Sequence, residues 1–345
     1  MRPHPHTKRL NGAARRLLSR TAAAVILAAG ASGCGQHAQR QTVGRFLAYS
    51  KGVSGDWPAI WLARVDGTHA RRLAGPGIYP VVSPDGRWVA FDGCLRARDL
   101  CLRLVSTSGG QQRLLLHNSG PATWSPRSDL VVARYGQALA AIDLAGHATV
   151  LAPKVGGDWS VSPDGRRVAY TRARPRPRCG AELVTVAIDG HDLRVIAVGR
   201  DERLVWGPPG IAVSRYPPDC SNARRIWLIA PDGSGTRPIT PPLSAKLRRG
   251  GYTGLDPVAW APDGRVLLAG LASEDSLEAL RVEAATRRFR RLRGYAMDLS
   301  RDGRFALVQE GGSETPQTIL SAPVAAGGRP QVLARGNVCC PSWNR

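Results

Sequence analysis

The chain has 345 residues and carries 48 Lys and Arg against 26 Asp and Glu, which gives a formal net charge of +22. Hydrophobic residues make up 43% and charged residues 21%, values that exclude an intrinsically disordered chain. The 39 Gly and 26 Pro residues follow no collagen-like period, and the composition also excludes a coiled coil and a polytopic membrane protein. The length allows one large globular domain or two small ones.

The first 33 residues have the order of an export signal. Residues 1–20 contain six basic residues and no acidic one, and an apolar run from Ala22 to Ala29 follows. This run is too short to cross a bilayer of about 30 Å as a helix. The tract Ala31-Ser32-Gly33-Cys34 resembles the lipobox of bacterial lipoproteins, although Ala31 stands where that family usually has Leu.

The resemblance implies cleavage before Cys34 and lipidation of its thiol. The sequence thus predicts a lipoprotein signal peptide at residues 1–33 and a lipidated Cys34 with a flexible tether at residues 34–44. The alternative is an ordinary secretory signal with an incidental cysteine. Removal of residues 1–33 takes away six basic residues and leaves a net charge of +16.

A five-residue phrase recurs along the rest of the chain. Copies of the type Ser-Pro-Asp-Gly-Arg, each followed by an apolar run, begin at Ser83, Ser162, Ala261 and Ser300. Each period also contains an apolar strand that meets a turn, as at Asp189-Gly190, and an Arg-rich returning strand. Asp-Gly between two β-prone runs is a strong hairpin signal, because the turn needs positive φ. Four short strands in a period of about 40–45 residues describe a propeller blade.

We therefore predict an all-β chain, a single β-propeller of seven four-stranded blades over residues 45–345. The chain ends where a blade should have its first strand, and residues 45–50 begin where a blade should have its second. The sequence thus predicts closure by a blade shared between the N- and C-termini, which leaves no open sheet edge.

The repeated phrase resembles the TolB-type propeller repeat over residues 45–345, and it is also similar to the propeller of prolyl-oligopeptidase-type peptidases. TolB carries an additional N-terminal α/β domain, for which there is no room between Cys34 and Arg45. No hydrolase domain of the peptidase type is present in the sequence. A TolB-like role in the envelope is therefore an analogy at the level of the fold.

Six cysteines follow Cys34, an even number in an exported protein, and this favours disulfides. Cys94 and Cys101 flank a predicted hairpin end, and Cys179 and Cys220 fall in corresponding loops of two neighbouring blades, so we predict these two bridges. The adjacent Cys339 and Cys340 form either a vicinal disulfide or two free thiols. A zinc site is disfavoured, because no pair has C-x-x-C spacing.

The sequence contains no Gly-x-Ser-x-Gly elbow after the signal, no His-Glu-x-x-His zinc helix and no phosphate loop. His69, His147 and His191 follow the turns of different blades and cannot converge on one site. The repeated Asp and Trp residues are interpreted as turn caps and inter-blade core. They are Asp85, Asp164, Asp263 and Asp302, and Trp124, Trp159, Trp206, Trp260 and Trp343. We therefore expect no catalytic residues, no metal, no cofactor and no enzyme activity.

Arg-rich loops of the fourth and fifth blades stand out from this background. The predicted basic face consists of Arg172, Arg174, Arg176, Arg178, Arg215, Arg224, Arg225, Lys246, Arg248 and Arg249. Loops on a rigid scaffold are the usual place for function. The alternative is that Arg is simply the habitual surface cation of this chain, since only four of its 48 basic residues are Lys.

These observations predict a lipoprotein on the outer side of the cytoplasmic membrane or in the periplasm, whose propeller is a non-catalytic binding or scaffold module. The expected partners are an envelope protein, an anionic glycopolymer or lipid headgroups, with no nucleic acid, and the protein is expected to be a monomer or a subunit of an envelope complex. One alternative is a lactonase- or quinoprotein-like propeller enzyme that works in the central channel. Another is a subunit of a larger complex with no ligand of its own.

Overall fold

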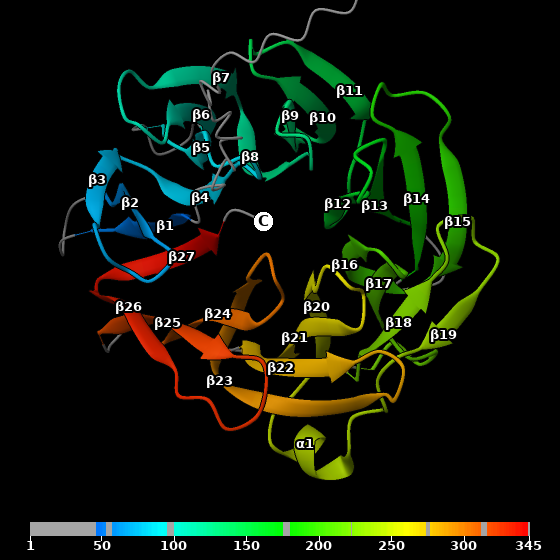
Figure 1. Ribbon diagram of the computed structural model, residues 1–345. Helices are drawn as coiled ribbons and strands as arrows, with labels where there is room; N and C mark the ends of the chain where they lie inside the picture. The colour runs from blue at the N-terminus through cyan, green and yellow to red at the C-terminus, as the bar shows by residue number, and fades with distance from the viewer. Residues whose placement is uncertain are drawn as a thin grey trace, which may run out of the picture. The chain divides into compact units, whose positions relative to one another are not determined.

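The computed structural model describes residues 46–52, 57–94, 100–174, 180–221, 223–273, 277–311 and 316–343. These residues belong to one compact unit, residues 41–345. The expected signal peptide, Cys34 and the tether lie outside the described residues. Within the unit, antiparallel sheets succeed one another around a centre, as Figure 1 shows. The predicted all-β class is thus confirmed in its main feature, a nearly all-β chain of many antiparallel sheets.

The sheets follow the chain order, apart from the last strand. The first sheet contains β27 (Val338–Trp343), β1 (Phe46–Lys51), β2 (Ala59–Arg64) and β3 (Arg71–Ala74). The second contains β4 (Ile78–Val82), β5 (Trp88–Asp92), β6 (Cys101–Ser106) and β7 (Arg113–His117). The third contains β8 (Ser119–Trp124), β9 (Leu130–Tyr135), β10 (Ala138–Asp143) and β11 (Ala148–Ala152).

The fourth sheet contains β12 (Trp159–Val161), β13 (Arg167–Ala173), β14 (Ala181–Ala187) and β15 (Arg194–Gly199). The fifth contains β16 (Asp201–Gly207), β17 (Gly210–Arg215), β18 (Arg225–Ile229) and β19 (Thr236–Pro238). The last sheet has seven strands, β20 (Gly254–Trp260), β21 (Val266–Ala272), β22 (Leu277–Glu283), β23 (Arg288–Leu299), β24 (Phe305–Glu310), β25 (Gln317–Pro323) and β26 (Gln331–Gly336). The 12-residue strand β23 pairs with both β22 and β24.

The Asp-Gly turns form locally, from their own side chains. Oδ1 of Asp85 accepts hydrogen bonds from the Arg87 amide at 3.0 Å and from the Ser83 hydroxyl at 2.5 Å. Gly86 then takes a φ of 74°, which a glycine adopts at little cost. The equivalent Oδ1 atoms of Asp164, Asp263 and Asp302 each accept an amide hydrogen bond two residues ahead. These aspartates therefore cap turns, as predicted, at the junction of the first and second strands of their blades.

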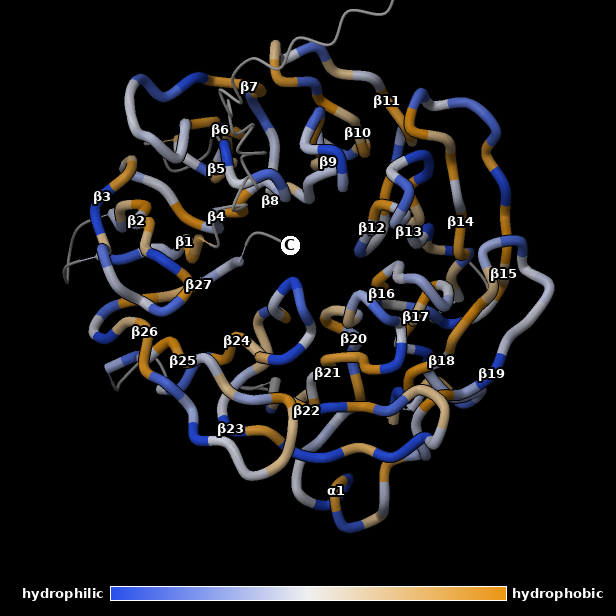
Figure 2. Tube along the Cα trace, viewed as in Figure 1, coloured by the Kyte–Doolittle hydropathy of each residue, from blue (hydrophilic) through white to orange (hydrophobic). Residues whose placement is uncertain are grey.

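Apolar side chains pack between successive sheets, and Figure 2 shows hydrophobic residues along the strands. The repeated tryptophans lie at these junctions, as predicted: Trp124, Trp260 and Trp343 are buried and Trp159 and Trp206 half-buried. The indole N–H of Trp124 donates to the carbonyl of Val81 in the preceding sheet at 2.9 Å. Packing against its neighbours therefore stabilises each sheet, in addition to the strand pairing within it.

The two ends of the described chain meet in the first sheet. Strand β27 pairs antiparallel with β1, with Leu47 opposite Trp343 and Ser50 opposite Cys339. The amide of Trp343 also donates to Oδ2 of the buried Asp298 at 3.1 Å. The pairing of a C-terminal strand with an N-terminal one is what the partial repeats at the two ends predicted.

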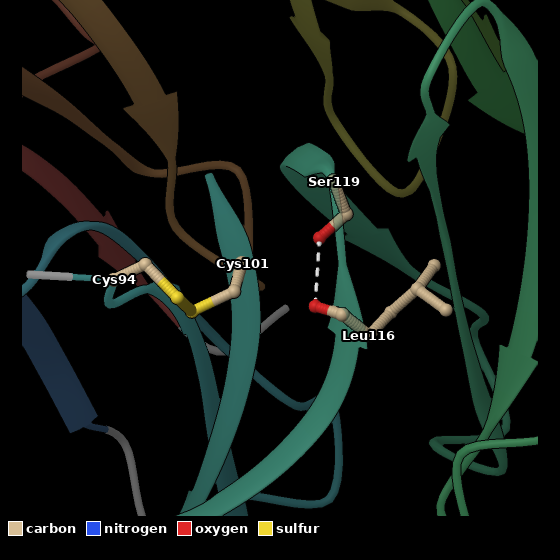
Figure 3. The surroundings of a disulfide bond; sticks show 4 residues. All are labelled: Cys94, Cys101, Leu116 and Ser119. Atoms are coloured by element: carbon tan, nitrogen blue, oxygen red, sulfur yellow. Dashed lines mark hydrogen bonds between the residues drawn. A yellow bond between two sulfur atoms is a disulfide. The ribbon is translucent and has the colours of Figure 1, made fainter. Parts of the chain in front are cut away.

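The cysteines bear out the disulfide prediction in part. Cys94 and Cys101 are joined, as Figure 3 shows, beside the hydrogen bond from Ser119 Oγ to the Leu116 carbonyl. Cys220 is disulfide-bonded, and its expected partner Cys179 lies outside the described residues. Of the two alternatives for Cys339 and Cys340, the structure has the free thiols, which share a hydrogen bond, and not the candidate disulfide.

One short helix, α1 (Ala245–Arg249), interrupts the strands of the described chain between β19 and β20. Ser244 is its N-cap and accepts a hydrogen bond from the Leu247 amide. In the part of the chain that the structure describes, no helix combines the length and apolarity needed to span a membrane.

Candidate functional site

Described residues at the loop ends of the fourth and fifth sheets line a cavity of about 700 Å³. Its wall is built from the ends of β13, β15 and β17, the starts of β14 and β18, and the segment before β20. Five arginines line it: Arg174, Arg200, Arg215, Arg225 and Arg248. No Asp or Glu is among its described lining residues. The cavity is therefore a concentrated positive site on a largely preformed surface.

The side chain of Trp227 organises two of these arginines. The guanidinium of Arg225 lies 4.6 Å from the centroid of an indole ring of Trp227, and that of Arg215 lies 5.5 Å from it. Strand pairing explains this arrangement, because Arg215 is opposite Arg225 in the β17–β18 register. Cation–π contact of this kind restricts a flexible guanidinium without neutralising it. Trp227 thus preorganises positive charge in the cavity wall.

A buried carboxylate further fixes Arg215. Asp201, at the start of β16, accepts two hydrogen bonds from Arg215, at 2.5 Å and 2.9 Å. Arg200, the residue before it, donates from Nη1 to the carbonyl of Pro217 at 3.1 Å. Arg200 was missed by the sequence prediction. The signal that could have found it is its position after a fourth strand, where loops emerge on the same edge of the propeller as the other basic loops.

The structure removes Arg224 from the predicted basic face. Its side chain turns inward, away from the described lining of the cavity, and pairs with the buried Asp256 at 3.3 Å and 3.4 Å. Its Nη1 also donates to the hydroxyl of Tyr216 at 3.2 Å. Adjacent residues at the edge of a strand point to opposite sides, so Arg225 faces the cavity while Arg224 is a buried structural ion.

Glu182 holds the arginines at the end of β13. Arg172 donates to its carboxylate from Nε at 2.9 Å and also from Nη2, and this pairing raises the pKa of Arg172. Nε of Arg174 lies 3.6 Å from the same carboxylate. Arg172 is therefore satisfied by its own sheet, whereas Arg174 also lines the cavity. The predicted site residues Arg176 and Arg178 lie outside the described residues.

Helix α1 contributes one cation to the cavity. Arg248 lines the wall, whereas Lys246 and Arg249 are exposed and are not among its described lining residues. Among the described residues, Arg200, Arg225 and Arg248 form no ion pair. These three guanidinium groups keep their charge available to a ligand.

The described residues contain few other groups that could bind a metal or act in catalysis. They contain no group of three or more His, Cys, Asp or Glu residues that could hold a metal ion. His147 pairs with the exposed Asp143 at 2.9 Å, at the outer turn of its sheet. His69 and His191 are exposed in turns of other sheets, so these histidines do not converge.

No protein-family model and no curated protein matches the sequence. Solved structures share the fold. An oligogalacturonate lyase from Vibrio parahaemolyticus is 16% identical with a TM-score of 0.57, over 85% of this chain and 86% of that one. TolB from Acinetobacter baumannii is 13% identical with a TM-score of 0.53, over 87% and 82%. A prolyl endopeptidase is 15% identical with a TM-score of 0.64, over 86% of this chain but only 48% of the enzyme.

These likenesses define the class of protein: the chain has a TolB-like β-propeller fold. They also correct one expectation. We expected no enzyme activity because known catalytic motifs are absent from the sequence, but a lyase and an endopeptidase have this fold. The missing motifs are therefore no ground for excluding catalysis, since the same fold supports both catalytic and non-catalytic functions.

Proposed function

We propose that this protein is an exported lipoprotein, anchored through Cys34, whose propeller binds an anionic saccharide in the basic cavity. The proposed propeller has seven four-stranded blades, with β23 serving as the last strand of one blade and the first of the next. The blade that contains β27 and β1 closes the ring. This count is supported by the double pairing of β23 and by apolar clusters that join each sheet to the next.

One observation carries the binding proposal: a cavity of about 700 Å³ is lined by five arginines and by no described carboxylate, and three of these arginines, Arg200, Arg225 and Arg248, are in no ion pair of the described residues. Guanidinium groups bind carboxylates and phosphates through paired hydrogen bonds, which are stronger than those between neutral groups. The arrangement of Arg215 and Arg225 around Trp227 reduces the entropy that their ordering would otherwise cost on binding. The cavity is thus suited to an anion of small-molecule size.

The rest of the wall indicates what carries the anionic group. Val198, which is 57% exposed, lies in the wall with Leu243 and three prolines, Pro217, Pro218 and Pro242. These groups offer apolar contact to the carbon-bound hydrogens of a ring and few hydrogen bonds to a fully hydrated ion. An acidic sugar combines a carboxylate with such a ring. The Vibrio structure with this fold is named for oligogalacturonate, a chain of carboxylated sugars.

The proposed anchor places this cavity outside the cytoplasm. The predicted export signal, residues 1–33, ends before Cys34, and two or more acyl chains on that residue would give stable attachment where one chain is marginal. A TolB-like fold is compatible with this location. Metabolic labelling with a radioactive fatty acid tests the anchor, because the label should be lost in a Cys34→Ala variant.

Calorimetric titration with trigalacturonate, beside neutral galactotriose, tests the binding function. We expect trigalacturonate to bind, with an affinity that falls at high salt, and galactotriose not to bind. A variant with Arg200, Arg225 and Arg248 replaced by Ser should bind trigalacturonate at least about tenfold more weakly, because the loss of even one charged hydrogen bond costs about 1.5–3 kcal/mol. Ultraviolet absorbance of a parallel sample of protein and trigalacturonate reports whether a lyase-type elimination forms an unsaturated product.

The matched control replaces Arg166, Arg265 and Arg301 by Ser. These side chains are exposed in turns on the opposite edge of the sheets, so this variant loses the same net charge without touching the cavity. It should bind like the unmodified protein. Equal weakening in both variants would show that the overall charge, rather than the cavity, attracts the ligand, and would reject the proposal.

A further inference from the structure

A second cavity, of about 430 Å³, is lined mainly by residues of the third and fourth sheets. It is lined by the starts of β8 and β12, by the end of β9, and by Arg203 near the start of β16. Arg134 and Arg203 are its cations, and Asp158 is its described carboxylate. The function proposed above does not use this cavity.

The strand order places both cavities on the same face of the propeller. In an antiparallel blade, the starts of the first and third strands and the ends of the second and fourth lie on one edge. The second cavity is lined by starts of first strands and the end of a second strand. The first cavity is lined by starts of third strands and ends of second and fourth strands.

A short chain of ion pairs and one hydrogen bond joins residues in the walls of the two cavities. Arg203, in the wall of the second cavity, has its Nε 3.7 Å from Oδ2 of Asp256 and its Nη1 3.6 Å from Asp158. Asp256 also binds Arg224, which in turn donates to Tyr216 in the wall of the first cavity. Arg203 is 54% exposed, so its guanidinium faces solvent at the junction while its partners hold it in place.

Two glycines form a part of the second cavity, called its floor here, that has no side chains and is open to a ligand. Gly120 and Gly136 line it, and a Cβ added at Gly120 would meet its nearest atom, Cβ of Arg134, at 4.0 Å. Glycine at such positions allows close approach of a ligand to the main chain. None of the ion pairs of the described residues involves Arg134, whose exposed side chain adds a positive charge to the lining of this cavity.

We infer that the two cavities are subsites for one linear oligosaccharide that carries a negative charge on every sugar, such as an oligogalacturonate. This inference rests on the proposed function, since the first cavity must bind the acidic sugar. The first cavity then binds one end of the chain, Arg203 contacts its middle, and Arg134 binds a further carboxylate.

Titration with galacturonate oligomers of increasing length tests the inference. We expect the affinity to rise from the trimer to longer oligomers, by about tenfold or more, and then to level off once both cavities are occupied. Arg134→Ser should remove this gain while the affinity for trigalacturonate stays unchanged. Gly120→Leu should have the same effect by filling the floor, with an unchanged melting temperature as the check on folding. Arg301→Ser, on the opposite edge, is the control.

The outcomes separate the two proposals. Absence of trigalacturonate binding would reject the proposed function itself. Binding of trigalacturonate with no gain in longer oligomers, or a gain that Arg134→Ser leaves intact, would overturn the second subsite alone. Equal loss for short and long oligomers in Arg134→Ser would also overturn it, because Arg134 would then act on the first cavity.

Discussion

The carboxylate of Asp201 is fully buried and accepts two hydrogen bonds from the guanidinium of Arg215, at 2.5 Å and 2.9 Å. The two residues are opposite one another in the β16–β17 register. The pair therefore joins the fold of the fifth sheet to the wall of the basic cavity, because Arg215 also lies over Trp227.

Asp201→Asn should destabilise the protein by about 3 kcal/mol, since removal of one member of a buried pair leaves the other charge uncompensated. Urea unfolding of the variant measures this. Replacement of both partners, Asp201→Asn with Arg215→Met, should recover part of the loss, because no unpaired charge remains. A single variant as stable as the unmodified protein would show that the pair contributes nothing to the fold.

Burial raises the pKa of Asp92, at the end of β5, to about 7, and its Oδ1 has no hydrogen-bond partner among the described residues. In the unfolded chain an Asp titrates near pH 4. The folded state therefore binds the Asp92 proton more tightly than the unfolded chain does. The stabilisation of the folded state by this proton is complete below about pH 4 and is lost as the pH rises to about 7. The loss amounts to about 4 kcal/mol.

Asp92→Asn should remove this dependence. Urea unfolding at pH 5 and pH 8 should show a smaller loss of stability in the variant than in the unmodified protein. At pH 8 the variant should be the more stable of the two. Parallel pH profiles for the two proteins would contradict the assignment to Asp92.

The free thiols of Cys339 and Cys340 should differ in reactivity. The hydrogen bond from Cys340 lowers the pKa of Cys339, while the same bond and burial raise the pKa of Cys340. Iodoacetamide should therefore modify Cys339 first, as peptide mass spectrometry would show. Cys340→Ala should slow modification at neutral pH about fivefold, for a hydrogen bond of about 1 kcal/mol. Cys340→Ser, which keeps a donor, should retain most of the rate, and equal rates in both variants would exclude this hydrogen bond as the cause.

Deletion of residues 338–345 should abolish the cooperative unfolding transition. It removes β27, exposes the edge of β1, and leaves Asp298 without the amide of Trp343. Trp343→Phe is the matched control, because it keeps the strand and removes a buried indole N–H that has no partner among the described groups. Unchanged calorimetric melting of the truncated protein would show that the pairing of the two ends does not stabilise the sheets.

The repeated phrase was enough to place most strands and turns, because its chemistry is local. An Asp that caps an amide two residues ahead, followed by a glycine with positive φ, forms the same turn wherever it occurs. The apolar strand expected before the Asp189-Gly190 turn is β14, which ends at Ala187. The bridge from Cys94 to Cys101 could be predicted for the same reason, since both cysteines belong to one hairpin end.

The cavity depended on contacts that no local pattern contains. Arg224 and Arg225 are indistinguishable in sequence, but Asp256, 32 residues further along the chain, binds the first and leaves the second to face Trp227. Arg200 joins the wall from a different loop because β15 and β17 end on the same edge of neighbouring sheets. The sequence by itself thus determined the repeat, the turns and the basic character of one set of loops. Only the packing of sheets against each other decided which arginines are neutralised by buried acids and which keep their charge for a ligand, because those partners are distant in the chain.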